Sequence, residues 1–404
     1  MKIYIVGGAV RDALLGLPVR DRDYVVVGTT PQQMLQRGFL QVGKDFPVFL
    51  HPKTHEEYAL ARSERKTAPG YKGFLFHAAP DVTLEQDLVR RDLTINAIAR
   101  AEDGSLIDPF GGQRDIAARV FRHVSPAFAE DPVRILRLAR FAARFALPPH
   151  DFAVAPETNV LMRQMVAAGE VDALVPERVW QELARGLTEE KPSRMFDVLR
   201  DCGALARLLP ELDSVWETPS PHHPDTKTGL NTMLLIDVAA RQNLTLPIRL
   251  ALLLHDLDAG TDMISPVAAV CERLRVPHDC RDLAIMTARE YVNLNSTPQL
   301  NADATVSLLE RCDALRKPQR FADLLQTLAC SLAGREASDG ANQPQAQHDY
   351  LLAALAAAQA VDAGRIAADT VQAYPGQQQR IALAIRAARV AAIRAMTQAN
   401  QSGT

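Results

Sequence analysis

Two short segments near the start of the chain combine residue types that handle phosphate groups. In the first, Gly7-Gly8-Ala9-Val10-Arg11-Asp12 follows the apolar run Ile3–Val6. This order is typical of a strand, a tight turn and the start of a helix. Glycine lets the backbone approach a ligand closely, and the first N–H groups of a helix bind anions. The turn therefore suits a triphosphate.

Two carboxylates follow in Asp21-Arg22-Asp23. We expect them at the start of a strand that runs from Asp21 to Val27, where a spacing of two residues places both on one face. Adjacent carboxylates repel each other unless a cation lies between them, and Mg²⁺ with substrate phosphates is the usual solution with oxygen ligands. Together with the glycine turn, the pair predicts phosphoryl or nucleotidyl transfer.

Each segment also has an ordinary structural explanation. A Gly-Gly pair is most often only a turn, and Asp-x-Asp is often a solvated strand end. The two segments favour a functional interpretation because they occur together, at this spacing, at the start of one chain.

The composition limits the class of protein. At 404 residues the chain is long enough for two or more domains, and its net charge of −3 gives no overall positive field for nucleic acid. A local basic patch is still compatible with RNA binding. The five cysteines form no Cys-x-x-Cys pair, which favours free buried thiols in a reducing compartment. Without a leader or an apolar run long enough to span a bilayer, we expect a soluble cytoplasmic protein.

The elements that must position these groups divide the chain in two. Up to about residue 110 short apolar runs alternate with polar turns, whereas beyond Asp115 long helical patterns rich in Ala, Leu and Arg take over. A small α/β head before an all-helical body is an α+β arrangement. We expect a loop at Ser338–Gln347 before an Ala-rich tail. The expected strands are Lys2–Val6, Asp23–Val27, Phe46–His51, Glu57–Ala61 and Ser105–Asp108, and the expected early helices are Arg11–Leu15 and Pro31–Arg37.

A third segment, Glu130-Asp131-Pro132-Val133-Arg134, opens a predicted amphipathic helix. Proline suits the first helical turn, and the two acids lie at the positive end of the helix dipole. Apolar residues at helical spacing predict a buried stripe, with charged residues every three positions beside it. Surface helices with internal ion pairs show the same pattern, so the pattern alone does not decide. The stripe is Ile135, Leu138, Ala139 and Ala142, and the charged set is Asp131, Arg134, Arg137 and Arg140.

Taken in order, the motifs resemble those of class II tRNA nucleotidyltransferases, the bacterial CCA-adding enzymes. The resemblance covers more than half of the chain, and five motifs occur in the order that the family shows. The motifs are Gly7-Gly8-x-x-Arg11-Asp12, Asp21-x-Asp23, Arg90-Arg91-Asp92-x-Thr94-x-Asn96-Ala97, Asp108-Pro109-Phe110-Gly111-Gly112 and Glu130-Asp131-x-x-Arg134, and the match continues through Pro176-Glu177-Arg178-Val179-Trp180.

The resemblance implies a mechanism and a role for each motif. Asp21 and Asp23 would be catalytic and would hold two Mg²⁺ ions, one at the 3′-OH of tRNA and one at the triphosphate. Asp131 and Arg134 would select CTP and ATP without a template, because the carboxylate accepts a hydrogen bond from the amine of C or A and faces a carbonyl in U or G. The phosphates and the rest of the nucleotide would be held by Gly8, Arg11, Arg91, Arg137 and Arg140.

The resemblance also implies an organisation. Residues 1–140 would form a nucleotidyltransferase head with a polymerase-beta-like palm, 141–215 a helical neck, 216–335 an HD-like body and 336–404 a helical tail. The segment Arg62–Tyr71 corresponds to a loop that helps convert the pocket from CTP to ATP, which predicts the full C-C-A activity. The expected partner is the 3′ end and acceptor arm of tRNA, and no protein partner can be inferred.

Downstream, the chain resembles the long bacterial form that carries an added HD phosphohydrolase domain, but the metal motif departs from the pattern. His255-Asp256 fits the central pair, yet Asn231 occupies the place of the first histidine, and Val292 and Asn293 stand where the last His and Asp are expected. One pair of ligands cannot close a divalent site. We therefore expect an HD-like scaffold without phosphatase or phosphodiesterase activity, in which His255-Asp256 is a buried structural pair.

Two other functions stay open at this point. A bacterial poly(A) polymerase would share the head motifs, although relatives of that kind tend to carry a strongly basic C-terminal region, which this chain lacks. A non-catalytic tRNA-binding protein descended from the enzyme would explain the eroded HD motif, but a pseudoenzyme usually loses metal ligands such as Asp21 and Asp23 first. Residues 351–404 carry five arginines against two aspartates, which fits either solvated helix faces or contacts to tRNA phosphates.

Overall fold

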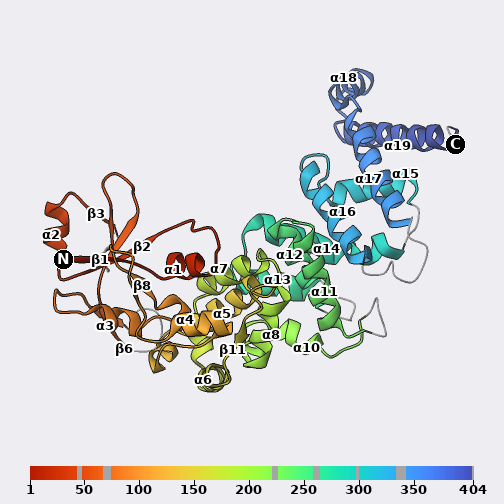
Figure 1. Cartoon of the computed structure of the whole chain (residues 1–404). Coiled ribbons are helices and arrows are strands. Elements are labelled where there is room, and N and C mark those ends of the chain that lie inside the picture. Colours follow the sequence, from red (N-terminus) through yellow and green to blue (C-terminus); the bar gives the residue numbers. More distant parts are fainter. Residues whose placement is uncertain are drawn as a thin grey trace. The chain divides into compact units, whose positions relative to one another are not determined.

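The computed structural model describes residues 1–42, 48–66, 74–220, 226–257, 264–296, 300–333 and 343–402, and it divides into two compact units (Figure 1). The strands lie in the first unit, Met1–Ser214, and the second unit, Val215–Thr404, is built from helices. The predicted α+β fold is confirmed. The division lies beside the predicted end of the neck at residue 215, whereas the boundaries at 140 and 335 stay predictions.

A seven-stranded mixed sheet forms the core of the first unit. β1 (Lys2–Val6) lies antiparallel to β2 (Asp23–Val27), which runs parallel to β5 (Glu57–Leu60). Buried apolar side chains cover both faces, in two separate clusters. The sheet order is β3 (Leu40–Val42), β4 (Val48–Leu50), β5, β2, β1, β8 (Ala99–Arg100), β9 (Leu106–Ile107), and two small sheets pair β6 (Ser63–Lys66) with β7 (Phe74–His77) and β10 (Val120–Phe121) with β11 (Ala153–Val154).

The strand predictions are confirmed with small shifts at the ends. β1 has the predicted bounds, and β4, β5 and β9 lie inside the predicted runs, although residues 46 and 47 fall outside the described chain. β2 has the bounds Asp23–Val27 that the list of expected strands gave, so only the other description of this strand, with its start at Asp21, is wrong. Asp23 pairs with the last residue of β1, Val6, and with the first residue of β5, Glu57. Asp21 therefore has no neighbouring strand to which it can bond.

The turn after β1 requires its first glycine. Gly7 has a φ of 70° and caps α1 (Gly8–Leu14), which begins three residues before the predicted start at Arg11. A Cβ at Gly7 would lie 3.1 Å from Nη1 of Arg91. Any other residue would therefore be strained in its backbone and crowded by that guanidinium. The second predicted helix is α2 (Pro31–Gln36), one residue shorter than expected.

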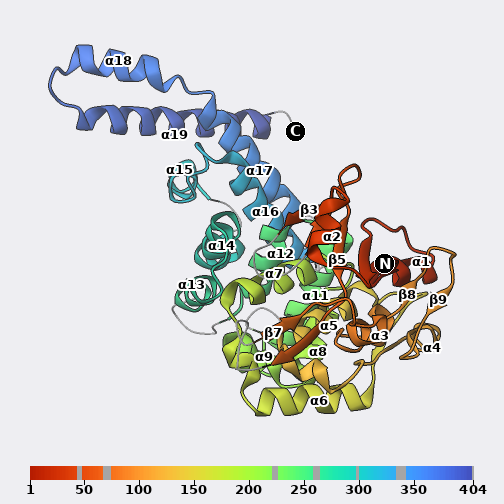
Figure 2. The same cartoon turned by 90° about the vertical axis from the view of Figure 1, so that its left-hand side faces the viewer.

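Helix α5 (Val133–Arg144) has the buried stripe that the sequence predicts. The four stripe residues, from Ile135 to Ala142, are each at most 2% exposed. They pack against α7 (Pro176–Leu187) and α8 (Ser193–Asp201), which lie beside α5 in both views (Figures 1 and 2). The other helices before the division are α3 (Leu84–Val89), α4 (Gly112–Ala118), α6 (Pro156–Ala167), α9 (Ala204–Leu208) and α10 (Pro210–Val215), with 3₁₀ turns at Thr94–Asn96, Pro126–Glu130 and Glu170–Ala173.

The second unit packs its helices around α12 (Leu246–Leu254) and α14 (His278–Ser296), which contact each other and α16 (Pro318–Ala333). The first part of the predicted loop Ser338–Gln347, up to residue 342, lies outside the described residues. For its last five residues the loop prediction is wrong, because α17 begins at Gln343. The other helices are α11 (Thr228–Arg241), α13 (Ile264–Arg273), α15 (Ala302–Arg311), α17 (Gln343–Gln359) and the paired α18 (Ala363–Ala373) and α19 (Gln379–Ser402), seen side by side in Figure 2.

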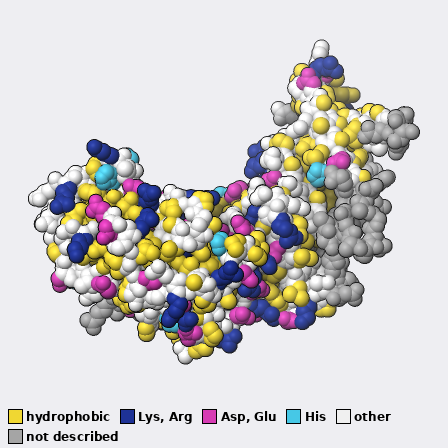
Figure 3. Space-filling view, in the orientation of Figure 1, with side chains coloured by type: hydrophobic (Ala, Val, Ile, Leu, Met, Phe, Trp, Pro, Cys, Tyr) yellow, Lys and Arg dark blue, Asp and Glu magenta, His cyan; other side chains and the backbone are white. Residues whose placement is uncertain are grey.

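The five cysteines are buried as free thiols, and the surface carries charges of both signs. All five cysteines are free and buried, as predicted, and burial raises the pKa of Cys271 to about 11, so this thiol is un-ionised at neutral pH. On the face drawn in Figure 3, basic and acidic side chains are interspersed. Among the described residues, no single helix is both long and apolar enough to cross a membrane.

Candidate active site

A cavity of about 1230 Å³ in the first unit brings together every residue that the sequence suggested for catalysis or nucleotide binding. Its lining contains eleven arginines and eight acids, so a basic site exists in a chain whose net charge is −3. The residues come from the turn after β1, the start of β2, the segment after α3, and helices α5 and α7. The nine predicted residues in the lining are Gly8, Arg11, Asp21, Asp23, Arg91, Asp131, Arg134, Arg137 and Arg140.

Asp21 and Asp23 form one acidic part of this cavity. Burial raises the pKa of Asp23, the charge of Arg91 lowers it, and the charge of Asp21 raises it, with a net rise. Asp21 is therefore close enough to repel Asp23, although only Asp23 belongs to the strand. In the described chain neither carboxylate has an ion-pair partner within 4 Å. Two carboxylates that repel each other in a partly desolvated place are a donor set that divalent cations bind.

A chain of hydrogen bonds links α1 to α5. Arg11 donates from Nε to Asp12 (2.8 Å) and from Nη1 to the side-chain oxygen of Asn96 (2.6 Å). Asn96 donates in turn to Asp92 (2.9 Å), which also accepts from Nε of Arg137 (2.9 Å). Burial by itself would raise the pKa of Asp92. The charge of Arg137 and the hydrogen bonds that the carboxylate accepts outweigh burial, so this pKa lies well below its ordinary value.

Arg11 lies deep in this group of contacts. Its side chain is only 3% exposed and lies over the rings of Phe141 (4.9 Å) and Phe145 (5.2 Å). Arg144 binds the other oxygen of Asp12 (3.0 Å). Arg11 lines the cavity, but its hydrogen bonds go to the protein. The phosphate contact that the resemblance implied for Arg11 stays a prediction.

The two predicted base-reading residues lie at the N-terminus of α5. Asp131 accepts a hydrogen bond from the backbone N–H of Val133 (3.2 Å) and forms a bidentate ion pair with Arg178 on α7 (3.1 and 2.8 Å). Arg134 is buried and donates to the carbonyl oxygens of Ala127 (2.7 Å) and Arg90 (2.6 Å). Both side chains are thus fixed in orientation by the protein itself.

The remaining predicted arginines also have acidic partners. Arg91 contacts Asp87 (3.2 Å) and Arg140 contacts Glu182 (2.6 Å). The Nε of Arg91 is buried and has no hydrogen-bond partner in the part of the chain that the structure describes. These acids and Arg178 were not among the residues predicted for the site. The helical spacing of Asp87 and Arg91 was an available signal, whereas Glu182 follows Arg140 by 42 residues and no local pattern connects them.

In the second unit His255 and Asp256 are buried, as the sequence predicts. Nδ1 of His255 lies 2.7 Å from the carbonyl oxygen of Leu252, and Nε2 lies 3.3 Å from Asp256. Asn231, at the place of the expected first histidine, is buried in α11. Within the described ranges no three side chains of His, Cys, Asp or Glu are grouped as metal ligands. The backbone of Val292 and Asn293 lies in α14, and residues 258–263 fall outside the described chain.

Comparisons with known proteins identify relatives of this chain. The model of the poly A polymerase head domain matches residues 3–122, and the model described as a probable RNA and SrmB-binding site of polymerase A matches residues 151–215. The multifunctional CCA protein of Janthinobacterium sp. (strain Marseille) is 62% identical over 98% of this chain and 97% of its own length. That of Burkholderia mallei (strain SAVP1) is 59% identical over 97% of this chain and 98% of its own.

Solved structures show the same fold. The Bacillus stearothermophilus CCA-adding enzyme in complex with CTP has a TM-score of 0.64 at 22% identity, and the similarity covers 100% of this chain and 95% of that one. A tRNA nucleotidyltransferase complexed with a primer tRNA and an ATP analogue has a TM-score of 0.57 at 25% identity over 83% and 93% of the two chains. The identity to the curated relatives extends over nearly the whole length. The chain therefore belongs to the multifunctional CCA proteins, the bacterial CCA-adding tRNA nucleotidyltransferases.

Proposed function

We propose that the cavity of the first unit adds C, C and A to the 3′ end of tRNA, using CTP and ATP and releasing pyrophosphate. One observation carries the assignment: two carboxylates that have no ion-pair partner among the described residues share a cavity with two residues able to read a base. Family membership supports the reaction, and solved relatives bound to CTP or to tRNA support both substrate classes. The segment Arg62–Tyr71 is described only to residue 66, so its part in the change from CTP to ATP stays a prediction.

CCA-adding enzymes depend on a divalent metal, and we assign Mg²⁺ to Asp21 and Asp23. The donor set fits, because both groups offer carboxylate oxygens and no described cation pairs with either. When bound, the metal supplies Lewis-acid stabilisation of the attacking 3′-oxygen and of the leaving pyrophosphate. Arg91 lies close enough to lower the pKa of Asp23, and its unpartnered Nε suits this side chain to a phosphate oxygen.

Asp131 is the residue we assign to base selection. A carboxylate has about four acceptor positions. Three are used, one by the N–H of Val133 and two by Arg178. The remaining position can accept from the exocyclic amine of cytosine or adenine, whereas uracil and guanine present a carbonyl oxygen that the carboxylate repels. Arg134 lies one helical turn after Asp131, and its guanidinium is held by two backbone carbonyl oxygens. It supplies hydrogen-bond donors for the acceptor atoms of the base ring.

Asp92 acts through its neighbours and is a positioning residue. It binds Arg137 directly and Arg11 through Asn96, so one carboxylate fixes cations on two elements. The proposed catalytic pair, Asp21 and Asp23, lies at the start of β2, and the proposed base-reading pair, Asp131 and Arg134, lies at the start of α5. The distance between these two pairs decides whether a nucleotide can reach both, because reacting atoms must be placed to within a fraction of an ångström.

The first experiment uses a tRNA transcript that lacks its 3′-CCA. We expect the protein with Mg²⁺, CTP and ATP together to add three nucleotides, and to stop short of three when either nucleotide is omitted. The Asp23→Asn variant should add none, because one carboxylate of the metal pair is lost. Product length on a sequencing gel is the measurement. Repeated addition of A to unrelated RNAs would identify a poly(A) polymerase instead, and no addition with tRNA still bound would identify a non-catalytic protein.

Loss of the Asp131 carboxylate should relax nucleotide selection. In Asp131→Asn an amide can turn its N–H₂ toward the carbonyl of U, so we expect UTP incorporation relative to CTP to rise about tenfold or more, since one such contact provides about 1–3 kcal/mol of discrimination. Single-nucleotide incorporation kinetics measure this ratio. Asp81→Asn is the matched control, because Asp81 is an exposed acid of the same unit outside the cavity. Equal selectivity in both variants would contradict the assignment.

Loss of the Asp92 charge should destabilise the first unit at neutral pH. Because Arg137 is partly exposed, we expect Asp92→Asn to lower the free energy of unfolding by about 1–3 kcal/mol, less than for a fully buried pair. The folded-state pKa of Asp92 is depressed, so this stabilisation exists above the ordinary carboxyl pKa and is lost as pH falls toward the folded value. Urea unfolding should therefore show a difference from wild type that shrinks below about pH 4.

The matched control for this prediction is Asp197→Asn, which removes a surface ion pair with Arg194 in the same unit. We expect that control to change stability by less than about 1 kcal/mol. A further readout tests positioning: Asp92→Asn should lower kcat for CTP addition at a pH where the variant is fully folded. A difference from wild type that stays constant down to pH 3 would contradict the role of the Asp92 charge.

The second unit should not hydrolyse 2′,3′-cyclic nucleotides. His255-Asp256 is a buried pair, and the described residues offer no third ligand. We expect purified protein with added Mg²⁺, Ni²⁺ or Co²⁺ to release product at the background rate, equal to that of an Asp256→Asn variant. Metal-stimulated turnover that the variant loses would show a working HD site.

A further inference from the structure

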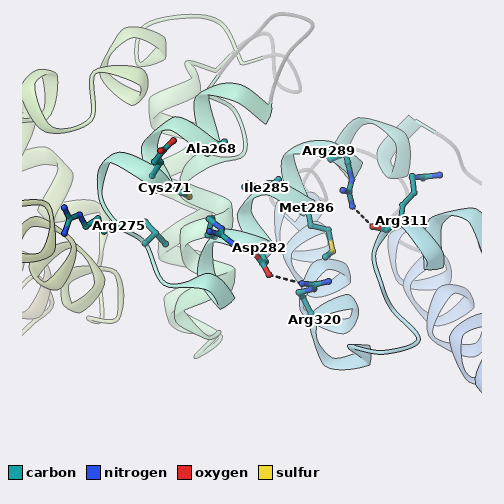
Figure 4. A pocket seen from close by; sticks show the side chains of 12 residues that line it. Ala268, Cys271, Arg275, Asp282, Ile285, Met286, Arg289, Arg311 and Arg320 are labelled. Carbon is teal, nitrogen blue, oxygen red and sulfur yellow. Dashed lines mark hydrogen bonds and ion pairs between the residues drawn. The ribbon is translucent and has the colours of Figure 1, made fainter.

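The second unit contains its own pocket, of about 690 Å³, with a wall rich in arginine. Helix α14 forms one side, and the rest comes from α13 and the segment after it, the end of α15 and the start of α16 (Figure 4). Two acids, Glu272 and Asp282, also line it. The arginines of the lining are Arg275, Arg281, Arg289, Arg311 and Arg320. We call these five residues and their cavity the arginine pocket.

The spacing on α14 explains how the arginines share one face. Arg281, Ile285 and Arg289 follow at intervals of four, so their side chains lie on the same side of the helix. At 1.5 Å rise per residue, Arg281 and Arg289 are about 12 Å apart along the axis. Ile285 and Met286 place apolar surface between them (Figure 4). The pocket therefore combines separated cations with an apolar wall.

Two carboxylates serve four of the arginines. Asp282 binds Arg281 through one oxygen (3.0 Å) and Arg320 through the other (3.1 Å). Glu290, which is completely buried, binds both Arg289 (2.9 Å) and Arg311 (2.9 Å). Sharing the one negative charge of Glu290 leaves Arg289 and Arg311 with an excess positive charge. Arg320 has a second, longer contact, to Asp313 (3.9 Å).

The guanidinium groups also keep hydrogen-bond donors that the protein does not use. Each guanidinium has five N–H groups. The Nε of Arg320 is buried without a partner among the described residues. Arg311 bonds Glu290 through Nε and Nη2, so its Nη1 has no hydrogen bond among the described residues. Arg289 uses Nε and Nη2 and also has the thiol of Cys312 as a side-chain partner. A buried donor without a partner is unfavourable, and a ligand acceptor removes that cost.

We infer that the arginine pocket binds a phosphate group, separately from the cavity of the first unit. Guanidinium forks match phosphate oxygens in geometry and charge. The volume exceeds that of a single phosphate and lies in the range of small-molecule sites, so room remains for the sugar or base that carries the phosphate. That phosphate belongs either to the backbone of an RNA or to a free nucleotide, and the two sources give different results in the test below.

The test variant is Arg281→Gln. Arg281 is 38% exposed in its side chain, and its partner Asp282 keeps Arg320, so no buried charge is left alone. Arg289→Gln is a second variant, because Glu290 keeps the bidentate contact to Arg311. The matched control is Arg316→Gln: Arg316 is 81% exposed, lies in the same unit and is not part of the pocket. Thermal unfolding establishes that all three variants are folded.

In the RNA arm, filter binding of tRNA lacking CCA is measured over a salt series. If the pocket binds a backbone phosphate, Arg281→Gln raises Kd about three- to tenfold and lowers the slope of log K against log salt by about 0.7–1, whereas Arg316→Gln matches wild type. In the nucleotide arm, equilibrium dialysis counts ATP bound per chain. If the pocket binds a free nucleotide, wild type and Arg316→Gln bind two ATP, and Arg281→Gln and Arg289→Gln bind one.

One result would overturn the inference. If Arg281→Gln and Arg289→Gln behave like Arg316→Gln in both arms, the arginines only hold α14, α15 and α16 together. CCA addition by the wild-type protein is measured independently, so failure of this inference and failure of the proposed function are separate outcomes.

Discussion

The first unit depends on the chain of charges and hydrogen bonds that runs from Arg144 through Asp12, Arg11, Asn96 and Asp92 to Arg137. Ionised groups removed from water are costly unless each meets a partner in good geometry. Every charged group in this series of hydrogen bonds has a partner only when α1, the Thr94–Asn96 turn and α5 have one particular arrangement. The same arrangement connects α1, which follows the glycine turn, to α5, whose N-terminus carries the proposed base-reading residues Asp131 and Arg134.

Much of the sheet could be predicted from the sequence because its signals are local. β1 and the two buried faces follow from short apolar runs, and Gly7 marks the turn because its backbone is left-handed. The start of β2 was predicted in two ways, at Asp21 and at Asp23, and the segment alone does not decide between them. Whether Asp21 joins the strand depends on the neighbouring strands. β1 ends opposite Asp23, and β5 begins opposite Asp23, so neither reaches Asp21. That information is in the partner strands and not in the segment itself.

The residues of the candidate site could be predicted, but their partners could not. An arginine that binds a ligand and an arginine that binds a carboxylate look the same in a motif. Asp131 and Arg178 are separated by 47 residues, and Arg140 and Glu182 by 42. Only folding brings α5 against α7, so only the structure shows that the carboxylate proposed to read the base is already held by Arg178. In the same way, only the structure shows that Arg11, a motif residue, is buried and lies over the rings of Phe141 and Phe145.

Net charge is a poor guide to anion binding in this protein because charge sharing operates locally. The chain has more acids than bases, yet Glu290 and Asp282 are each shared by two arginines, and the cavity of the first unit has more arginines than acids in its lining. A shared carboxylate orients two guanidiniums while neutralising only one of them. The oriented, under-neutralised pair is better prepared for a phosphate than two free arginines, because side-chain entropy has already been lost during folding. Internal ion pairs and anion binding are therefore compatible roles for the same arginines, and the acids that accompany them are part of how such a site is built.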